Sequence, residues 1–265
     1  MAIHTTGSYL KEVTPQLKEI ANSGFHIISS CEELSYPWKE HQKFAREIND
    51  FAQRNKISIL RTWINPGFLM DTLVITLKGL CQEISKIECK RIQDASERGL
   101  LFQKKIGTGL TFDEFQKKAN SGSIRHVGFR ESMLMISVSL NWNLDNIIET
   151  TRLIIAEKRL KSKFLTVEKG LVIGIDQTAI GTLKDSELIR LNLLAYLGCP
   201  YPKEEVSIEG FPKIQMEIKG GVNGDFGTTS IIVNSIPKIV NSEPGLHTMR
   251  DLPIPSALLG KKESL

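Results

Sequence analysis

The sequence predicts an α/β fold, with a parallel sheet in a small first part and a mixed sheet in a larger α+β part. In the first part, short apolar runs alternate with amphipathic runs of helical spacing, and short links join them. Farther along, long stretches alternate apolar and polar residues, as antiparallel strands do. We place the boundary near residue 65, between domains over 1–65 and 66–265.

The first domain reads as strand, helix, strand, helix, strand. A short apolar segment opens the chain, and residues 10–21 then carry apolar side chains at helical spacing. Gly24 stands where the end of a helix favours a left-handed backbone. The remaining expected elements are a strand over 25–28, a polar loop over 29–38, a helix marked by Phe44, Ile48 and Phe51, and a strand over 57–60.

The second domain is expected to start with helices and to continue mainly as strands. The expected helices are one carrying Leu69, Leu73, Leu77 and Leu80, one over 112–120 after an N-cap at Thr111, one over 129–141, and one over about 226–236 that ends at Pro237. The expected strands contain Ile87 and Cys89, Leu165 and Val167, 172–180, and 214–218.

The composition excludes several classes of protein. Hydrophobic residues make up 41% of the 265 residues and charged residues 24%, which is typical of a globular chain. A net charge of +4, spread along the sequence, gives no reason to expect binding to nucleic acid or to a membrane. No apolar run approaches the roughly 20 residues of a membrane span. The first twenty residues are too charged for a signal peptide, so we expect a soluble protein, and the sparse cysteines favour the cytoplasm.

Cysteine and histidine spacing gives no indication of a metal site. The four cysteines lie far apart and form no C-x-x-C pair, which favours reduced thiols. No two of the five histidines have the spacing of metal ligands. We expect no bound metal.

Polar or turn-forming residues follow each of the three strands predicted for the first domain. They are His4, Thr5, Thr6 and Ser8 after the first strand, Glu32 and Glu33 after the second, and Asn65, Pro66 and Gly67 after the third. Parallel sheets bind ligands at the edge where the carboxyl ends of their strands meet. We therefore expect these three segments to converge on one rim.

The adjacent carboxylates Glu32 and Glu33 are the candidate acid–base groups. They share a loop with Tyr36 and Pro37. Like charge and desolvation raise the pKa of one member of such a pair, toward the value that a general base needs near neutral pH. A solvated acidic loop is the alternative, and the residue pattern alone favours that alternative.

A glycine-rich stretch, 220–225, precedes the last expected helix. The free N–H groups at the start of a helix suit an anion. Tight packing at a strand-to-helix corner explains the glycines equally well, so both interpretations stay open. The sequence contains no G-x-G-x-x-G or G-K-[ST] phosphate loop.

Several ordered segments resemble the 2,4-diaminopentanoate dehydrogenase group, to which some native amine dehydrogenases belong and which is similar in fold to dihydrodipicolinate reductase. The segments are 4–10 (HTTGSYL), 32–38 (EELSYPW), 65–71 (NPGFLMD), 126–132 (HVGFRES) and the closing run from 220 to 253. The resemblance covers about residues 1–255. Ordered blocks of this kind are far more specific than one motif.

The resemblance implies an oxidoreductase that uses NAD or NADP for reversible oxidative deamination of a small amine or amino-acid substrate. It implies an incomplete Rossmann-like dinucleotide-binding domain over 1–65, followed by a substrate-binding and oligomerisation domain over 66–265, and a homodimer. The implied catalytic residue is Glu33, or else Glu32. The implied cofactor contacts are His4, Thr5, Thr6, Ser8, Asn65, Pro66 and Gly67. The implied substrate contacts are Tyr36, Phe68, His126, Gly220, Gly221 and Asp225.

Two departures from the group accompany the resemblance. Members of the group begin with a full dinucleotide-binding half that carries a glycine fingerprint. Here the chain opens near the fourth strand of such a domain, so we expect a shortened N-terminus that lacks roughly eighty residues. Trp63 stands where the group has a small residue, and its indole would fill substrate or nicotinamide space.

Two alternative functions stay open, the first of them because of these departures. One is a non-catalytic remnant that binds a partner, or half of a split enzyme that a separate nucleotide-binding polypeptide completes. The other is an imine reductase of the dihydrodipicolinate reductase type. The sequence contains no His-His-x-x-Lys run of the kind that this second chemistry uses.

Overall fold

A computed structural model describes residues 1–257 of the chain, which forms two compact units. The first unit combines Met1–Thr72 with the chain from Phe226 onward, and the second contains Leu73–Asp225. The sequence pattern did not reveal that the C-terminal segment returns to the first unit. The predicted α/β class, with one parallel and one mixed sheet, is confirmed.

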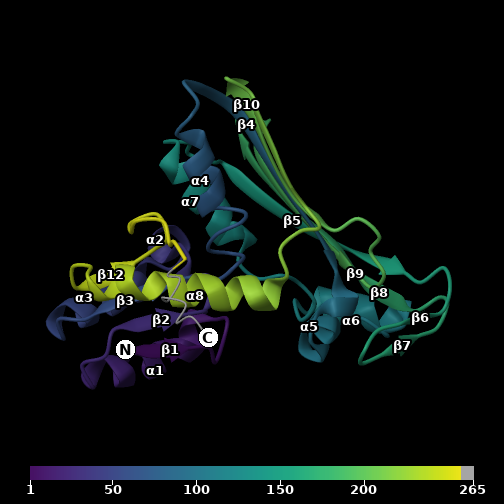
Figure 1. Ribbon diagram of the computed structural model, residues 1–265, viewed down its shortest axis with the longest axis horizontal. Helices are drawn as coiled ribbons and strands as arrows, with labels where there is room; N and C mark the ends of the chain where they lie inside the picture. The colour runs from purple at the N-terminus through teal and green to yellow at the C-terminus, as the bar shows by residue number, and fades with distance from the viewer. Residues whose placement is uncertain (258–265) are drawn as a thin grey trace, which may run out of the picture. The chain divides into compact units, whose positions relative to one another are not determined.

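The first unit is built on a four-stranded parallel sheet (Figure 1). Its strands pair in the order β1-β2-β3-β12, with bounds β1 (Ala2–His4), β2 (Ile27–Ser29), β3 (Ser58–Arg61) and β12 (Gly245–His247). Strand β1 near the start of the chain (purple) and β12, more than two hundred residues later (yellow), therefore belong to one sheet. Strand β12 was not predicted.

Helices α1 (Leu10–Asn22) and α3 (Gln42–Arg54) cover one face of this sheet. Their apolar residues, spaced three or four apart, share a core with alternate residues of β2 and β3. That core includes Leu10, Val13, Leu17, Ala45, Ile48, Ile27 and Ile59. Gly24 has the predicted positive φ, +75°, just after α1. Both predicted helices are confirmed.

Helix α8 (Gly224–Val240) packs on the opposite face of the sheet, against Ile28 and Leu60 (Figure 1). The prediction that this helix ends at Pro237 is wrong. Proline removes one N–H donor, but its carbonyl still accepts a hydrogen bond, here from Asn241 Nδ2 at 2.8 Å. Fully buried Ile239 continues the helix and packs in the same core.

Two short helices occupy the segment that was predicted as a polar loop after β2. They are the 3₁₀ helix η1 (Glu32–Leu34) and α2 (Pro37–Glu40). Pro37 begins α2, where its fixed φ suits the first helical position. The glutamate pair therefore lies in a helical turn.

The second unit contains a six-stranded mixed sheet in the order β11-β10-β4-β9-β8-β5. Its strands are β4 (Glu83–Asp94), β5 (Asn146–Ile155), β8 (Val172–Leu183), β9 (Ser186–Tyr196), β10 (Lys203–Phe211) and β11 (Ile214–Lys219). Only β4 and β9 pair in parallel within this described sheet. A small ribbon of β6 (Leu160–Lys161) and β7 (Thr166–Val167) accompanies it.

The helices of the second unit are short. They are α4 (Thr72–Lys78), η2 (Ala95–Glu97), α5 (Leu100–Lys105), α6 (Phe112–Asn120) and α7 (Phe129–Ser139), and α7 packs on β8 and β9. Helix α6 begins with the predicted N-cap Thr111, whose side chain and that of Glu114 form a capping box. Helix α4 starts later than predicted, because 66–71 form turns. No helix within residues 1–257 has the length and apolar character to cross a membrane.

Candidate functional site

The three predicted rim segments lie at the carboxyl ends of β1, β2 and β3, which are neighbours in the parallel sheet. The site residues predicted in the first domain belong to the loops that leave these strands, apart from His4, which is the last residue of β1. Two hydrogen bonds join the first two loops: Glu33 N–H donates to the Ser8 carbonyl at 3.2 Å, and Glu33 Oε2 accepts from Leu10 N–H at 2.7 Å. The structure therefore brings the predicted residues together within this unit.

His4 ties the end of β1 to the end of β2. Its buried ring lies 3.0 Å from Ser29 Oγ through Nδ1 and 2.8 Å from Thr6 Oγ1 through Nε2. Thr5 and Thr6 are exposed, and Ser8 is half-buried. His4 thus lies inside the rim, and the Thr6 hydroxyl, which also donates to Gln16 Oε1 at 2.6 Å, is held beside it.

Glu32 and Glu33 occupy different environments. The Glu33 side chain is 18% exposed, and its Oε1 lies 3.9 Å from Nε2 of His41. Its other oxygen receives the Leu10 N–H at the start of α1, where Tyr9 provides no side-chain cap. A helix N-terminus favours a negative charge, so Glu33 caps α1 from a neighbouring loop. Glu32 is half-buried.

The turn after β3 is held by Asp71, a residue that the sequence analysis did not single out. Asp71 Oδ2 accepts from Gly67 N–H at 2.7 Å, and Thr72 Oγ1 donates to the Gly67 carbonyl at 2.8 Å. Asn65 and Pro66 are joined by a cis peptide bond, and Asn65 Nδ2 contacts Met70 Sδ at 3.2 Å. The Asn65 amide is therefore buried within the turn.

Aromatic side chains near the rim pack into the first unit. Tyr36 is 6% exposed and hydrogen-bonded by Arg250. Burial raises the pKa of Tyr36, and the Arg250 guanidinium opposes that rise. Trp63 and Phe68 pack against the core that Ile232 of α8 shares with the sheet. The Trp63 indole therefore contributes to packing under α8.

Gly67→Ala is expected to destabilise the first unit. The backbone φ of Gly67 is +123°, and a Cβ there would lie 2.6 Å from the Trp63 carbonyl oxygen. We expect a loss of roughly 3 kcal/mol or more in the free energy of unfolding, measured by urea denaturation. Gly24→Ala is the matched control, with φ +75° and no atom within 4 Å of the added Cβ. We expect it to cost only about 1 kcal/mol. Equal losses would contradict the role assigned to the close approach at Gly67.

In the second unit, His126 is fixed by Gln177 of β8. His126 N–H donates to Gln177 Oε1 at 2.6 Å, and Gln177 Nε2 donates to the His126 carbonyl at 3.0 Å. The same Nε2 lies 3.2 Å from Glu149 Oε2, and burial raises the pKa of Glu149. The His126 ring packs edge-on against Phe129, with centroids 5.2 Å apart.

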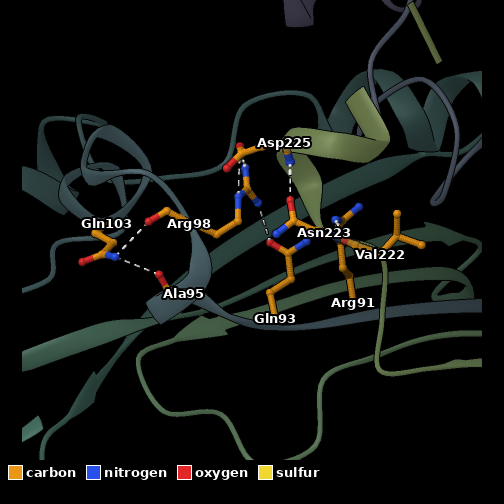
Figure 2. A network of polar contacts seen from close by, with 8 residues as sticks. All are labelled: Arg91, Gln93, Ala95, Arg98, Gln103, Val222, Asn223 and Asp225. Carbon is orange, nitrogen blue, oxygen red and sulfur yellow. Dashed lines mark hydrogen bonds and ion pairs between the residues drawn. The ribbon is translucent and has the colours of Figure 1, made fainter. Parts of the chain in front are cut away.

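The glycine-rich stretch borders a pocket of about 240 Å³ in the second unit. Arg98 crosses its wall: Nε lies 3.2 Å from Asp225 Oδ1, and Nη1 donates to Gln93 Oε1 at 3.1 Å (Figure 2). The guanidinium also covers the Phe102 ring. A Cβ on Gly224 would lie 2.3 Å from Arg98 Nη1, so a larger residue there would displace the Arg98 guanidinium from its present position. The pocket is lined by Ile92, Gln93, Asp94, Glu97, Arg98, Pro202 and 220–224, and His126 is not among these residues.

A buried ion pair, Arg91 and Glu204, holds the same turn. Arg91 Nε lies 3.5 Å from Glu204 Oε1, and the two side chains are 2% and 4% exposed. Arg91 Nη2 donates to the Val222 carbonyl at 3.0 Å, while Val222 N–H donates to Glu204 Oε1 at 3.2 Å (Figure 2 shows the Arg91 side). Burial raises the pKa of Glu204 to about 7 and lowers that of Arg91 to about 10. The pair therefore holds Val222 through both its backbone N–H and its carbonyl.

The rim of the first unit fits a dinucleotide's nicotinamide end in its chemistry. It offers the exposed Thr5 and the half-buried Ser8, next to Thr6, whose hydroxyl is bonded to His4 and Gln16. Thr62, directly after β3, adds a buried hydroxyl for which residues 1–257 provide no hydrogen-bond partner. Those same residues contain no group of three or more His, Cys, Asp or Glu side chains that could hold a metal ion.

The buried charged residues Arg61, Asp71, Arg91 and Glu204 escaped the sequence analysis. Arg61 follows the apolar run 57–60 and Arg91 interrupts an alternating strand. A charged residue inside a strand pattern could have indicated these buried ion pairs and hydrogen bonds, because a buried charge needs a partner.

The chain was compared with families, relatives and solved structures. Residues 68–265 match the family described as the 2,4-diaminopentanoate dehydrogenase C-terminal domain. A 2,4-diaminopentanoate dehydrogenase from Acetoanaerobium sticklandii is 34% identical over 261 residues, which is 96% of this chain and 74% of the relative. An amine dehydrogenase from Streptomyces virginiae is 23% identical over 291 residues, 96% of this chain and 77% of the relative.

The fold is shared with a solved amine dehydrogenase from Mycobacterium smegmatis. The TM-score is 0.85 at 21% sequence identity, over 97% of this chain and 77% of that one. The predicted resemblance is confirmed, and so is the prediction of an oxidoreductase of the dehydrogenase type. The dehydrogenase relatives support the predicted use of NAD or NADP. On the family match and the 34% identical relative, this chain belongs to the 2,4-diaminopentanoate dehydrogenase family.

Proposed function

We propose that the protein catalyses the NAD(P)-dependent, reversible oxidative deamination of a small amine or amino acid. The observation that carries this proposal is the carboxylate of Glu33, held by two loops at the carboxyl edge of the parallel sheet. Such edges bind nucleotides in α/β folds, and a carboxylate there can move the protons that the reaction requires.

The reaction converts a primary ammonium, NAD(P)⁺ and water into a ketone, an ammonium ion, NAD(P)H and a proton. The bound nicotinamide supplies the hydride acceptor. The substrate nitrogen must lose a proton before its carbon can give up hydride, and a water molecule must lose a proton to attack the imine carbon. A single carboxylate serves both proton transfers when it stays close to the reacting carbon.

Glu33 is the proposed base. Its Oε2 is occupied by the Leu10 N–H, which fixes the orientation of the carboxylate. Oε1 lies 3.9 Å from His41 Nε2, which places an imidazole next to the proposed base. Glu32, half-buried in the same helical turn, is the second candidate for this role.

Thr5, Thr6 and Ser8 are proposed to contact the cofactor through hydroxyl groups, with His4 buried behind them as their support. The turn formed by Asn65, Pro66 and Gly67 is proposed to supply backbone contacts, since the Asn65 side chain is turned to Met70. Tyr36 and Phe68 are proposed to border the substrate.

For the second unit, we propose that the pocket beside Gly220 and Gly221 binds part of a polar substrate. Its lining includes Arg98 together with Asp94 and Glu97, so it offers both charges to an amino acid. Asp225 lies beside this wall, paired with Arg98. His126, held in its own loop by Gln177, is a further proposed substrate contact.

A cytoplasmic homodimer is the proposed state of the protein. Light scattering of the purified chain tests this state, and a monomer mass at assay concentration would contradict it. Because the chain belongs to a family of dehydrogenases, other dehydrogenases of this kind are suitable references for these measurements.

Titration of the purified chain with NADH and NADPH, followed by reduced-nicotinamide fluorescence, tests the cofactor assignment. Amine-dependent reduction of NAD⁺ or NADP⁺ then tests the reaction, with 2,4-diaminopentanoate and simple primary amines as candidate substrates. We expect binding and turnover with one cofactor. Binding of neither cofactor, even at millimolar concentration, would contradict the proposal and favour a non-catalytic binding protein.

A further inference from the structure

Arg61 joins two of the rim loops from inside the protein. It is the last residue of β3, and its side chain is fully buried. Nε donates to the Cys31 carbonyl at 3.1 Å, Nη2 reaches the Ser30 carbonyl at 3.5 Å, and Nη1 donates to the Pro66 carbonyl. One guanidinium therefore contacts the loop after β2 and the turn after β3.

A buried guanidinium is costly unless its donors are satisfied. The neighbouring side chains on this face of the sheet, such as Ile59 and Ile57, are apolar and belong to the core under α1 and α3. Methionine or leucine would fill such a position more simply. Arginine is useful here because its planar fork directs several donors at fixed angles, which a flexible apolar chain does not do.

The contact with Cys31 acts directly on the glutamate pair. The Cys31 carbonyl also accepts the Leu34 N–H at 3.1 Å, the hydrogen bond that closes η1 around Glu32 and Glu33. Because Arg61 and Leu34 share this acceptor, the position of η1 depends on the guanidinium. Glu33 in turn reaches the first loop through Ser8 and Leu10, as described above.

The contact with Pro66 fixes the other side. The Pro66 carbonyl precedes Gly67, where an added Cβ would lie 3.0 Å from Arg61 Nη1. The turn thus folds back onto the guanidinium, and Asp71 holds it there through Gly67 N–H. The first loop, the glutamate loop and the Pro66 turn form one connected series with Arg61 between the last two.

We propose that Arg61 is a positioning residue, which holds the glutamate loop and the Pro66 turn in a fixed relation at the rim. This inference rests on the proposed function, because these loops carry the proposed base and cofactor contacts. Arg61 itself is fully buried, so it is not exposed to a molecule bound at the rim. It acts through the Cys31 and Pro66 carbonyls.

Arg61→Lys is the sharpest variant, because it keeps the charge and removes the fork. A single ammonium group cannot reproduce the angles of three donors directed at two loops. Hydrogen exchange of backbone amides in the full chain is the primary measurement. We expect faster exchange in 31–35 and 64–69, at least tenfold, with α1 and α3 unchanged.

Ser58→Ala is the matched control. Ser58 is a fully buried polar residue at the opposite end of the same strand, and its hydroxyl donates to the carbonyls of Ser242 and Glu243. It removes a comparable tie between β3 and another segment. We expect no change in exchange at 31–35 or 64–69 and no change in kcat.

Kinetics give the second readout. When a substitution at a distant residue displaces the reacting groups by about 1 Å, the rate falls roughly 100-fold. We expect Arg61→Lys to lower kcat by about 10- to 100-fold, with the KM for the amine changed less than threefold. For Arg61→Ala, added guanidinium ion is expected to restore part of kcat, and methylammonium is not. A purely structural loss of stability would not produce this selective rescue.

These outcomes distinguish the positioning role of Arg61 from the proposed dehydrogenase function. Unchanged exchange in both loops of Arg61→Lys overturns the inference, and so does faster exchange with wild-type kcat. Loosening of both loops together with the loss of kcat supports it. If the wild-type chain shows no dehydrogenase activity while Arg61→Lys still loosens both loops, the proposed function is contradicted and the tie formed by Arg61 is supported.

Discussion

Glu33→Gln is expected to lower kcat by roughly 10²- to 10⁴-fold, the usual contribution of a general base. The amide keeps an oxygen that accepts the Leu10 N–H, now 2.7 Å from Glu33 Oε2, so the cap on α1 is retained. The variant removes the capacity to take a proton and little else. Steady-state oxidation of the amine, at saturating cofactor, measures the loss.

Glu32→Gln is the control within the same turn. Its carboxylate is half-buried beside that of Glu33, and we expect less than a threefold change in kcat. Cofactor affinity, measured by fluorescence titration, should stay the same in both variants. A large loss in Glu32→Gln with normal turnover in Glu33→Gln would exchange the two roles, and normal turnover in both would remove the base from this loop.

Arg91→Met is expected to destabilise the second unit by about 3–5 kcal/mol, because it leaves Glu204 buried without its partner. It also removes the donor to the Val222 carbonyl, so the pocket wall loosens. Urea denaturation followed by a probe in the second unit measures the change. The double variant Arg91→Met with Glu204→Met replaces both charges by apolar groups of similar volume, and we expect it to stay within about 1 kcal/mol of the wild type.

The pH dependence of this unit has a definite sign. Burial raises the pKa of Glu204 from 4.5 to about 7, so the folded state holds a proton that the unfolded state has lost between these values. The stability that protonated Glu204 contributes is fully present below the pKa of 4.5, and it is lost as the pH rises through about 7. Arg91→Met should therefore cost more at about pH 8 than at about pH 5, and the double variant should lack this slope. A cost that does not change with pH would contradict the assignment to Glu204.

Local periodicity predicted those elements whose packing follows their own sequence. Helix α6 lies within the predicted limits and carries the predicted N-cap, because capping chemistry is written in neighbouring residues such as Thr111 and Glu114. Pro237 misled the prediction, since one lost donor is tolerated when the following turn is buried at Ile239. Strand β12 pairs with a segment almost two hundred residues away, and no local pattern reveals such a partner.

For the candidate site too, some features could be predicted from the sequence and others could not. The strand ends of a parallel sheet meet by topology, so His4, Glu33 and Gly67 could be expected on one rim before the structure was known. Their division of labour could not be expected, because the cap that Glu33 places on α1 joins residues 23 positions apart. The buried ties formed by Arg61 and Arg91 depend on carbonyls of distant loops, which the sequence does not identify.

Strand β12 has a consequence for how the protein is made on the ribosome. Before residues 245–247 are synthesised, the edge of β3 that they will occupy has no neighbour, and the face that α8 covers is open. The segment Leu73–Asp225, with its own sheet, is finished before that happens. Domains fold in the order in which their synthesis is completed. The second unit therefore folds first, and β12 joins the sheet of the first unit last.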